Sequence, residues 1–368
     1  MDFSNVTKFE IEGKEVTQLT INNQIFWQRK APTPRPVSKY FYIENISDKV
    51  NEIVLTGELP KQQPNCKFEY STDGKQWQVW GSTHDPMTSE LLPRYKYGLN
   101  IKLQPKQRMY LRGDNKTLAT DYYGRNTVLF NQYEVNIGGD LTTLISKEGN
   151  VLDLTGRDYC FLDLFTRAKV KNADNLILPS TTLSKSCYCG LFSSATGELN
   201  SLESANFELP AEVLTEDCYR AMMKATKISK SPIIKAKTMG KNSLIMMFAD
   251  CSNMNEVTIN FEKWSETDAQ EWLLNVNATG NINKPVDLEM NKGENGIPWN
   301  WSINGKYDLF YVEDASGQAN QLKIRKSGTY APIVTLEYSN DGQNWKIWEN
   351  MYNSPLPLPA NSKIFFKR

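Results

Sequence analysis

Residues 158–165 read DYCFLDLF, and the same pattern returns three times in the middle of the chain. The later copies are SCYCGLF at residues 186–192, DCYRAMM at 217–223 and NSLIMMF at 242–248. Aligned on their last residues, the four segments share a column of three cysteines and one serine, namely Cys160, Cys187, Cys218 and Ser243. Successive members of this column are 27, 31 and 25 residues apart. A repeat of this length is typical of a solenoid, in which short units stack and bury one another's apolar sides.

Each repeat has two parts. A leading segment begins nine residues before the column and reads LPSTTL at residues 178–183, LPAEVL at 209–214 and IKAKTM at 234–239. In the second part, Cys187 and Leu191 are four residues apart, which places both on one face of a helix. We therefore expect a short α-helix on the second part of each repeat, and a short strand or extended turn on the first.

The cysteines of the column are expected to be core residues. A solenoid column faces inward, where cysteine acts as a small apolar side chain. A zinc site would require two close pairs, and Cys187 and Cys189 form the only close pair among six cysteines. We therefore expect neither a metal nor a cofactor.

A second kind of module occurs twice. Residues 336–348 read LEYSNDGQNWKIW and match FEYSTDGKQWQVW at residues 68–80, where an Asp-Gly turn separates two strand-like stretches. The match extends upstream to FYVE at 310–313 and FYIE at 41–44, and downstream to KIFFK at 363–367 and RMYLR at 108–112. Two copies of one β-sandwich-like module, at residues 38–120 and 304–368, are thus predicted to flank the repeats at 121–303.

Residues 1–29 alternate between apolar and polar side chains, with the turn residues Glu12-Gly13 and Asn22-Asn23 between the alternating stretches. Three short strands are too few to hold a core, so this β-hairpin segment is expected to attach the protein to something larger. The candidate docking residues are its apolar ones: Phe9, Ile11, Leu19, Ile21, Ile25 and Trp27. The Pro-rich residues 30–37 are expected to form an extended linker. The predicted fold class is thus a multidomain α+β protein.

The repeat columns resemble BspA-type leucine-rich repeats. The residues that carry this resemblance are Leu178–Leu183, Cys187-Tyr188 with Leu191-Phe192, Met247–Met254, Trp264, Trp272 and Asn295–Trp301. Met223 and Ser243 depart from the pattern, which has Phe and Cys there. The resemblance implies that residues 121–303 form a short leucine-rich-repeat solenoid with caps. The N-terminal hairpins are similar to the leading segments of tail and fibre proteins from bacteriophages of gut bacteria.

Charge and motif content argue against several classes of function. The 42 basic and 42 acidic residues balance, so a nucleic-acid partner is not expected. No apolar stretch is long enough for insertion into a membrane. The chain has a single histidine, His84, and no nucleophile elbow, so catalysis by a Ser/His/Asp set is not expected. The integrin-type tripeptide Arg112-Gly113-Asp114 is interpreted as the end of a strand followed by a turn. A glycosidase that needs only two carboxylates is left open.

Tryptophans are the candidate contacts for a glycan. Alternation places Trp77 and Val79 on one side of a strand and Trp80 on the other, and the second module repeats this pattern. One tryptophan per module is expected to be core, and Trp80 and Trp348 are the candidate glycan or partner contacts.

The expected function is that of a bacteriophage virion structural protein, not an enzyme. It would be a head or tail fibre or decoration component, assembled in the cytoplasm of the bacterial host. Its expected partners are other virion proteins through the N-terminal segment, further copies of itself, and host-surface glycans. The alternatives are a bacterial cell-surface BspA-like adhesin and a carboxylate-dependent glycan hydrolase of a phage tail.

Overall fold

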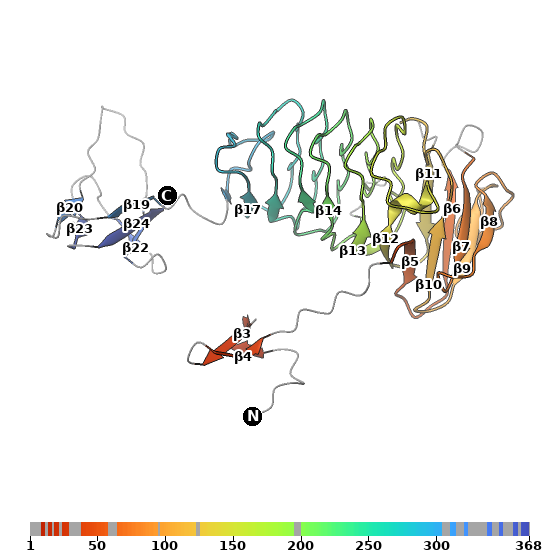
Figure 1. The fold of residues 1–368 in the computed structure, drawn as a ribbon, viewed down its shortest axis with the longest axis horizontal. Helices are drawn as coiled ribbons and strands as arrows, with labels where there is room; N and C mark the ends of the chain where they lie inside the picture. The colour runs from red at the N-terminus through yellow and green to blue at the C-terminus, as the bar shows by residue number, and fades with distance from the viewer. Residues whose placement is uncertain are drawn as a thin grey trace. The chain divides into compact units, whose positions relative to one another are not determined.

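The computed structural model describes residues 38–57, 65–94, 96–122, 126–194 and 200–303, together with the strands of residues 9–28 and residues 310–313, 320–322, 337–340, 346–348, 356–359 and 362–367. The chain divides into two compact units, Met1–Lys39 and Tyr40–Arg368. Figure 1 shows the course of the chain. Strands dominate the described residues, which agrees with the several β-sheets expected. The helical part of the expected α+β class is not found in the described residues, which contain one short 3-10 helix.

The N-terminal unit contains four strands in two antiparallel pairs, one strand more than the three expected from the sequence. They are β1 (Phe9–Ile11) with β2 (Lys14–Val16), and β3 (Gln18–Ile21) with β4 (Gln24–Gln28). The pairs flank residues 12–13 and 22–23, which the sequence marks as turns. All six candidate docking residues lie on these strands. The predicted linker at residues 30–37 lies outside the described residues.

The first β-module is built from two sheets that face each other across a shared core. Its strands are β5 (Phe41–Asn45), β6 (Asn51–Gly57), β7 (Lys67–Ser71), β8 (Gln78–Ser82), β9 (Leu99–Leu103), β10 (Arg108–Arg112), β11 (Thr127–Asn131) and β12 (Val135–Asp140). One sheet contains β12-β5-β10-β7-β8 and the other contains β11-β6-β9. Phe41 and Leu111 from the first sheet and Ile53 and Leu129 from the second are all buried in one cluster.

The C-terminal module repeats this strand order in its described strands. These are β19 (Phe310–Glu313), β20 (Asn320–Leu322), β21 (Glu337–Ser339), β22 (Lys346–Ile347), β23 (Leu356–Leu358) and β24 (Lys363–Lys367). The order β19-β24-β21-β22 corresponds to β5-β10-β7-β8, and β20-β23 corresponds to β6-β9. Even the register agrees, because Glu337 lies opposite Lys367 as Glu69 lies opposite Arg112.

The larger sheet continues from the first β-module into the repeats. Strand β12 pairs antiparallel with β5 on one side and parallel with β13 (Val170–Ile177) on the other. Residues 127–140, which the sequence analysis placed within the capped repeat region at 121–303, therefore supply strands to both sheets of the module, and β12 pairs with the first strand of the repeats.

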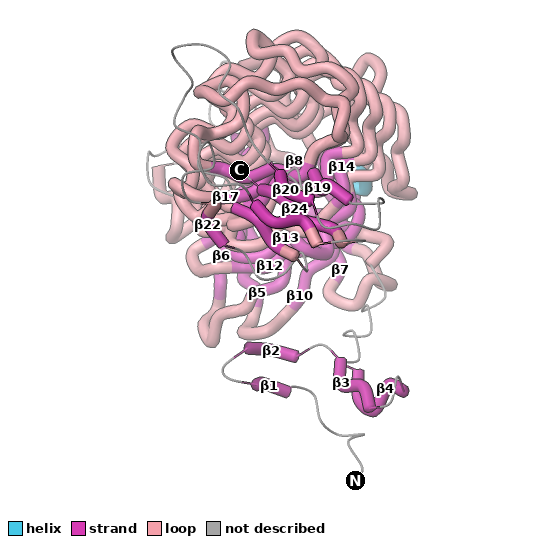
Figure 2. The backbone as a smooth tube through the Cα atoms, turned by 90° about the vertical axis from the view of Figure 1, so that its left-hand side faces the viewer, coloured by secondary structure: helices cyan, strands magenta, loops and turns pink. Residues whose placement is uncertain are grey.

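The repeats form coils that stack along one direction. The coils contribute short strands that pair parallel with their neighbours: β14 (Glu208–Leu209) with β15 (Ile233–Ile234), β16 (Glu256–Thr258) with β17 (Gly280–Asn283), and β17 with β18 (Trp301–Ile303). Figure 1 shows the strands along one side of the stack, and Figure 2 shows the loops of successive coils one behind another. The expectation of a short strand or extended turn in the first part of the repeat agrees with this arrangement.

The second part of each repeat is not an α-helix, and this expectation was wrong. The one helix among the described residues is a 3-10 helix at Leu141–Leu144. From Tyr159 to Phe165, every second amide instead donates to a carbonyl of the following coil over 2.8–3.0 Å. The intervening amides of Leu162 and Leu164 each donate to the carbonyl of the residue three positions earlier. The next three coils repeat this alternation, so half of these amides stabilise the contact between coils.

Left-handed backbone at every fourth residue produces this pattern. Within these segments φ lies between 49° and 63° at Tyr159, Asp163, Ser186, Gly190, Asp217, Ala221, Ala225, Asn242, Met246, Asp250, Glu271 and Asn275. Each such residue interrupts a helix and starts a new turn, at a cost of about 1–2 kcal/mol for a residue other than glycine. A period of four keeps residues at i and i+4 on one side, as a helix does. The spacing in the sequence therefore fits both structures.

The structure contains a fifth member of the repeat, which the sequence analysis did not align with the other four. The amide of Leu244 donates to the carbonyl of Asp268 over 2.9 Å, as the amide of Tyr219 donates to the carbonyl of Ser243 one coil earlier. Asp268 therefore occupies the cysteine column. The loop at residues 291–298 closes this coil, because the side chain of Asn295 accepts from the Glu271 amide at 3.0 Å.

Candidate binding pocket in the first β-module

The segment that connects β8 to β9, residues 83–98, folds back over the edge of the first module. Pro86 and Tyr97 form an isolated bridge, and the amide of Met87 donates to the carbonyl of Lys96 over 3.0 Å. Thr56 of β6 donates from its hydroxyl to the carbonyl of Tyr97 over 2.7 Å. The two arms of this segment are thus bonded to each other, and the segment is held to β6 through Tyr97.

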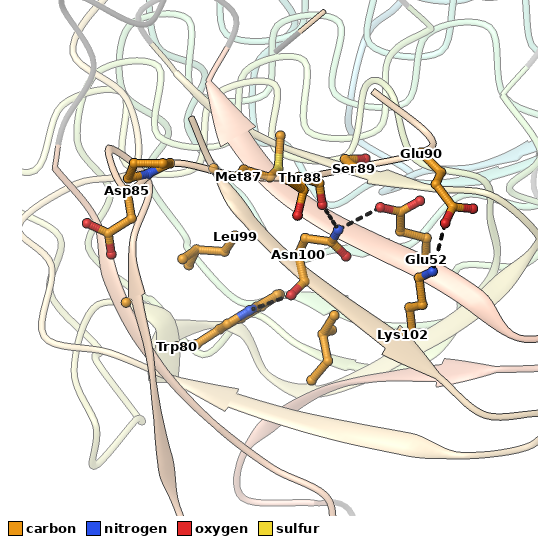
Figure 3. Close-up of a pocket in the computed structure, with 14 residues that line it drawn as sticks. Glu52, Trp80, Asp85, Met87, Thr88, Ser89, Glu90, Leu99, Asn100 and Lys102 are labelled. Atoms are coloured by element: carbon orange, nitrogen blue, oxygen red, sulfur yellow. Dashed lines mark hydrogen bonds and ion pairs between the residues drawn. The ribbon is translucent and has the colours of Figure 1, made fainter. Parts of the chain in front are cut away.

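A pocket of about 650 Å³ lies between this segment and strands β6, β8 and β9 (Figure 3). Its volume is in the range of sites for small ligands. The side chains that define its character are Glu52, Trp80, Asp85, Met87, Thr88, Glu90, Leu99, Asn100 and Lys102. The pocket thus combines carboxylates, hydroxyls, an amide and a lysine with the indole of Trp80 and several smaller apolar side chains.

Glu52 is a carboxylate of β6 that is only 4% exposed. One of its oxygens accepts from the Asn100 side-chain amide at 2.7 Å, and the other accepts from the backbone amide of Leu91 at 2.9 Å. A buried carboxylate requires such partners, because its desolvation is costly. Glu52 therefore ties the covering segment to the sheet.

The side chain of Asn100, on β9, has hydrogen-bond partners for its nitrogen but none for its oxygen among the described residues. Its side-chain nitrogen donates to Glu52 and also to the carbonyl of Thr88 over 2.5 Å. Both partners are acceptors, which fixes the orientation of the amide. Its side-chain oxygen is buried and has no hydrogen-bond partner among the described residues. An acceptor buried without a donor destabilises a folded protein by about 1–3 kcal/mol.

The rim of the pocket carries paired charges. Lys102 forms an ion pair with Glu90 at 3.1 Å, in which both side chains are largely exposed. Asp85 accepts from the backbone amide of Ser82 at 2.6 Å. Each of these two carboxylates keeps a further oxygen that can accept a hydrogen bond from a ligand.

The two candidate tryptophans are both buried. Trp80 is 7% exposed and Trp348 is 5% exposed. Trp80 lines the pocket and donates from its indole nitrogen to the carbonyl of Asn100 over 3.3 Å. Trp77, assigned by alternation to the opposite side, is half-buried beneath the guanidinium of Arg112, which lies 4.0 Å from the ring centre. Sequence alternation thus identified the two sides of the strand, but not the pocket that residues 83–98 build over one of them.

The tripeptide Arg112-Gly113-Asp114 and the single histidine, His84, are both held by local contacts. Arg112 forms an ion pair with Glu69 at 2.6 Å, and the amide of Gly113 donates to the carbonyl of Thr143 over 2.7 Å. Arg112 and Gly113 are therefore packed against the module, whereas Asp114 is exposed. His84 lies in the turn after β8, where its backbone amide donates to the hydroxyl of Ser82 over 3.1 Å.

Within the part of the chain that the structure describes, no three His, Cys, Asp or Glu side chains are grouped to hold a metal ion. None of the described helices has the length and apolar character needed to cross a membrane. In comparisons with known proteins, the chain matches no family model, no curated protein and no solved structure.

Proposed function

We propose that the protein is a structural and adhesive component of a bacteriophage particle, as a head or tail fibre or decoration protein. In this proposal residues 1–29 dock the chain to the particle, and the β-modules and coils are displayed outward. Binding to host-surface glycans and association with further copies of the chain belong to the same proposal.

The division of the chain into a very small and a large unit is the observation that supports this proposal best. Residues 1–39 separate as their own unit, and their described strands form only two-stranded pairs. Two-stranded hairpins are marginally stable alone in water. Such a segment gains stability by packing on a partner, which is what an attachment segment does.

We further propose that the coil stack is a BspA-type leucine-rich-repeat solenoid. The columns found in the sequence support this. In each of the four coils found by sequence, the residue after the cysteine or serine column donates its amide to the carbonyl of the column residue in the next coil. Tyr188 donates to the carbonyl of Cys218, and Tyr219 donates to that of Ser243, each over 3.1 Å. A stack of this kind spreads its binding surface over many repeats.

Mass spectrometry of purified particles and of host cell envelopes tests the proposed location. The protein is expected in the particles, at a copy number that corresponds to a symmetric structural component. Its absence from particles together with its presence on envelopes would support the cell-surface adhesin instead. Incubation with capsular polysaccharide is expected to release no new reducing ends, and their release would establish the glycan hydrolase.

A further inference from the structure

The duplication provides an internal comparison for the pocket. Twenty residues separate Trp80 from Ile101 in the first module, whereas seven separate their counterparts Trp348 and Leu356. The additional residues of the first module include the segment at 83–98 that covers the pocket. The module therefore forms its two sheets both with this segment and with a much shorter connection.

The polar residues under the segment also differ between the modules. Strand register places Gln321 and Pro357 opposite each other, where the first module has Glu52 opposite Lys102. By sequence position, Pro355 corresponds to Asn100. These three polar residues are thus not needed for the module fold, although the buried Leu103 has a buried counterpart in Leu358.

We propose that this pocket binds one or two sugar units of a glycan through their hydroxyl groups, which rests on the adhesive role proposed above. The unpaired oxygen of Asn100 requires a donor, and its own nitrogen is already committed to two acceptors. Sugar hydroxyls donate and accept at once, so they suit the free carboxylate oxygens of Asp85 and Glu90 as well as Lys102. Trp80 and Met87 supply apolar surface for the carbon-bound hydrogens of the ring.

Most charged groups of the pocket already have partners within the protein. Both oxygens of Glu52 accept hydrogen bonds, and one oxygen of Glu90 is paired with Lys102. A cation at Glu52 would have to displace these partners, so only the second oxygens of Asp85 and Glu90 are open to it. A sugar leaves these partners in place, and one of its hydroxyls can bond to the covered oxygen of Asn100 once the covering segment moves outward.

Saturation-transfer NMR on the purified full chain tests this proposal, with the methyl glycosides of glucose, galactose, mannose and N-acetylglucosamine as probes and methylguanidine as the cationic comparison. Asn100→Ala removes the unpaired acceptor together with the amide's own bonds to Glu52 and Thr88, whereas Met87→Trp fills the pocket without removing any of the hydrogen bonds of Glu52. Asn253→Ala, at an exposed asparagine of the coil stack, is the matched control. Thermal unfolding of each variant shows whether it is folded.

At least one glycoside is expected to give a saturable signal that Asn100→Ala weakens roughly tenfold, the effect of one lost hydrogen bond. Met87→Trp is expected to abolish the signal, and Asn253→Ala to leave it unchanged. The proposal is overturned if no glycoside binds, if folded Met87→Trp binds as the wild type does, or if only methylguanidine binds. Because particles play no part in this measurement, such a failure leaves the proposed virion location standing.

Discussion

At the scale of single residues, position 243 is the weak member of the inner column. Its side chain is fully buried, and its hydroxyl has no hydrogen-bond partner among the described residues. The other three members of this column found by sequence are cysteines, which are equally buried. Sulfur is far less demanding than a hydroxyl in an apolar interior. The repeat pattern and the burial therefore agree that the serine is a local defect.

Replacing this serine is expected to stabilise the protein. Ser243→Cys removes an unsatisfied hydroxyl and fills the same space, so we predict that the free energy of unfolding rises by about 1 kcal/mol. Denaturant unfolding measures the change. Ser184→Cys is the control, because the hydroxyl of Ser184 donates to the carbonyl of Arg157 over 2.7 Å and its loss should destabilise. A lower stability of Ser243→Cys would contradict this account of the column.

The cysteines themselves are expected to be chemically inert in the native state. All six are free and buried, and burial raises the pKa of Cys66 and Cys251 to about 11 and that of Cys218 to about 12. The reactive thiolate is therefore scarce at pH 8. Iodoacetamide followed by mass spectrometry is expected to label no cysteine in the native protein and all six in urea. Rapid native labelling of Cys218 would show that the coils open.

At the scale of elements, the turn segments explain why the sequence suggested helices. The spacing of Cys187 and Leu191 fits an α-helix and a chain of four-residue turns equally well, because both return to the same side after four residues. Ser186, Gly190, Asp217 and Asn242 at the left-handed positions were the available signal, since small and polar residues tolerate positive φ better than most. That signal is weak alone, because Met246 and Tyr159 occupy the same positions.

Gly190 tests the close packing of adjacent coils. An added Cβ there would lie 1.9 Å from a carboxylate oxygen of Asp163 in the preceding coil, in addition to the strain of φ near 62°. We predict that Gly190→Ala destabilises the protein by more than the roughly 1–2 kcal/mol that left-handed strain alone costs. Gly156→Ala is the matched control, because Gly156 also has positive φ but nothing lies within 4 Å of its added Cβ. Equal costs for the two substitutions would contradict the close packing of adjacent coils.

At the scale of the whole molecule, the sequence located its repeating parts better than the boundaries between them. The two β-modules and four coils follow from residue matches, which record strand register directly. The boundary at residue 120 does not hold as a division of the structure, because β11 completes a module sheet and β12 joins that module to the first coil. Pairing between strands that are far apart in the chain leaves no pattern in the local sequence, so it could not be predicted. The pocket was not predicted from the sequence for a similar reason, since its lining residues come from β6, β8, β9 and the covering segment, which are far apart in the chain.

The shared sheet and core predict that the first module and the coils unfold together. The ring centres of Phe41 on β5 and Phe165 in the first coil are 5.9 Å apart. The rings of Phe165 and Phe192 in the second coil stack with their centres 5.1 Å apart. Phe192→Ala should cost about 3–5 kcal/mol. Hydrogen exchange in this variant is expected to accelerate in peptides of β5 and β10 as well as in the coils. Acceleration confined to the coils would show two independently stable bodies.

The central functional claim is that residues 1–29 hold the protein on a particle. The most direct measurement is the copy number in purified particles of the full chain, of a chain without residues 1–29, and of a chain without residues 304–368, each quantified by mass spectrometry after folding has been verified. We predict that loss of residues 1–29 removes the protein from particles, while loss of residues 304–368 leaves its copy number unchanged. Incorporation of the chain without residues 1–29 at the full copy number would contradict the claim.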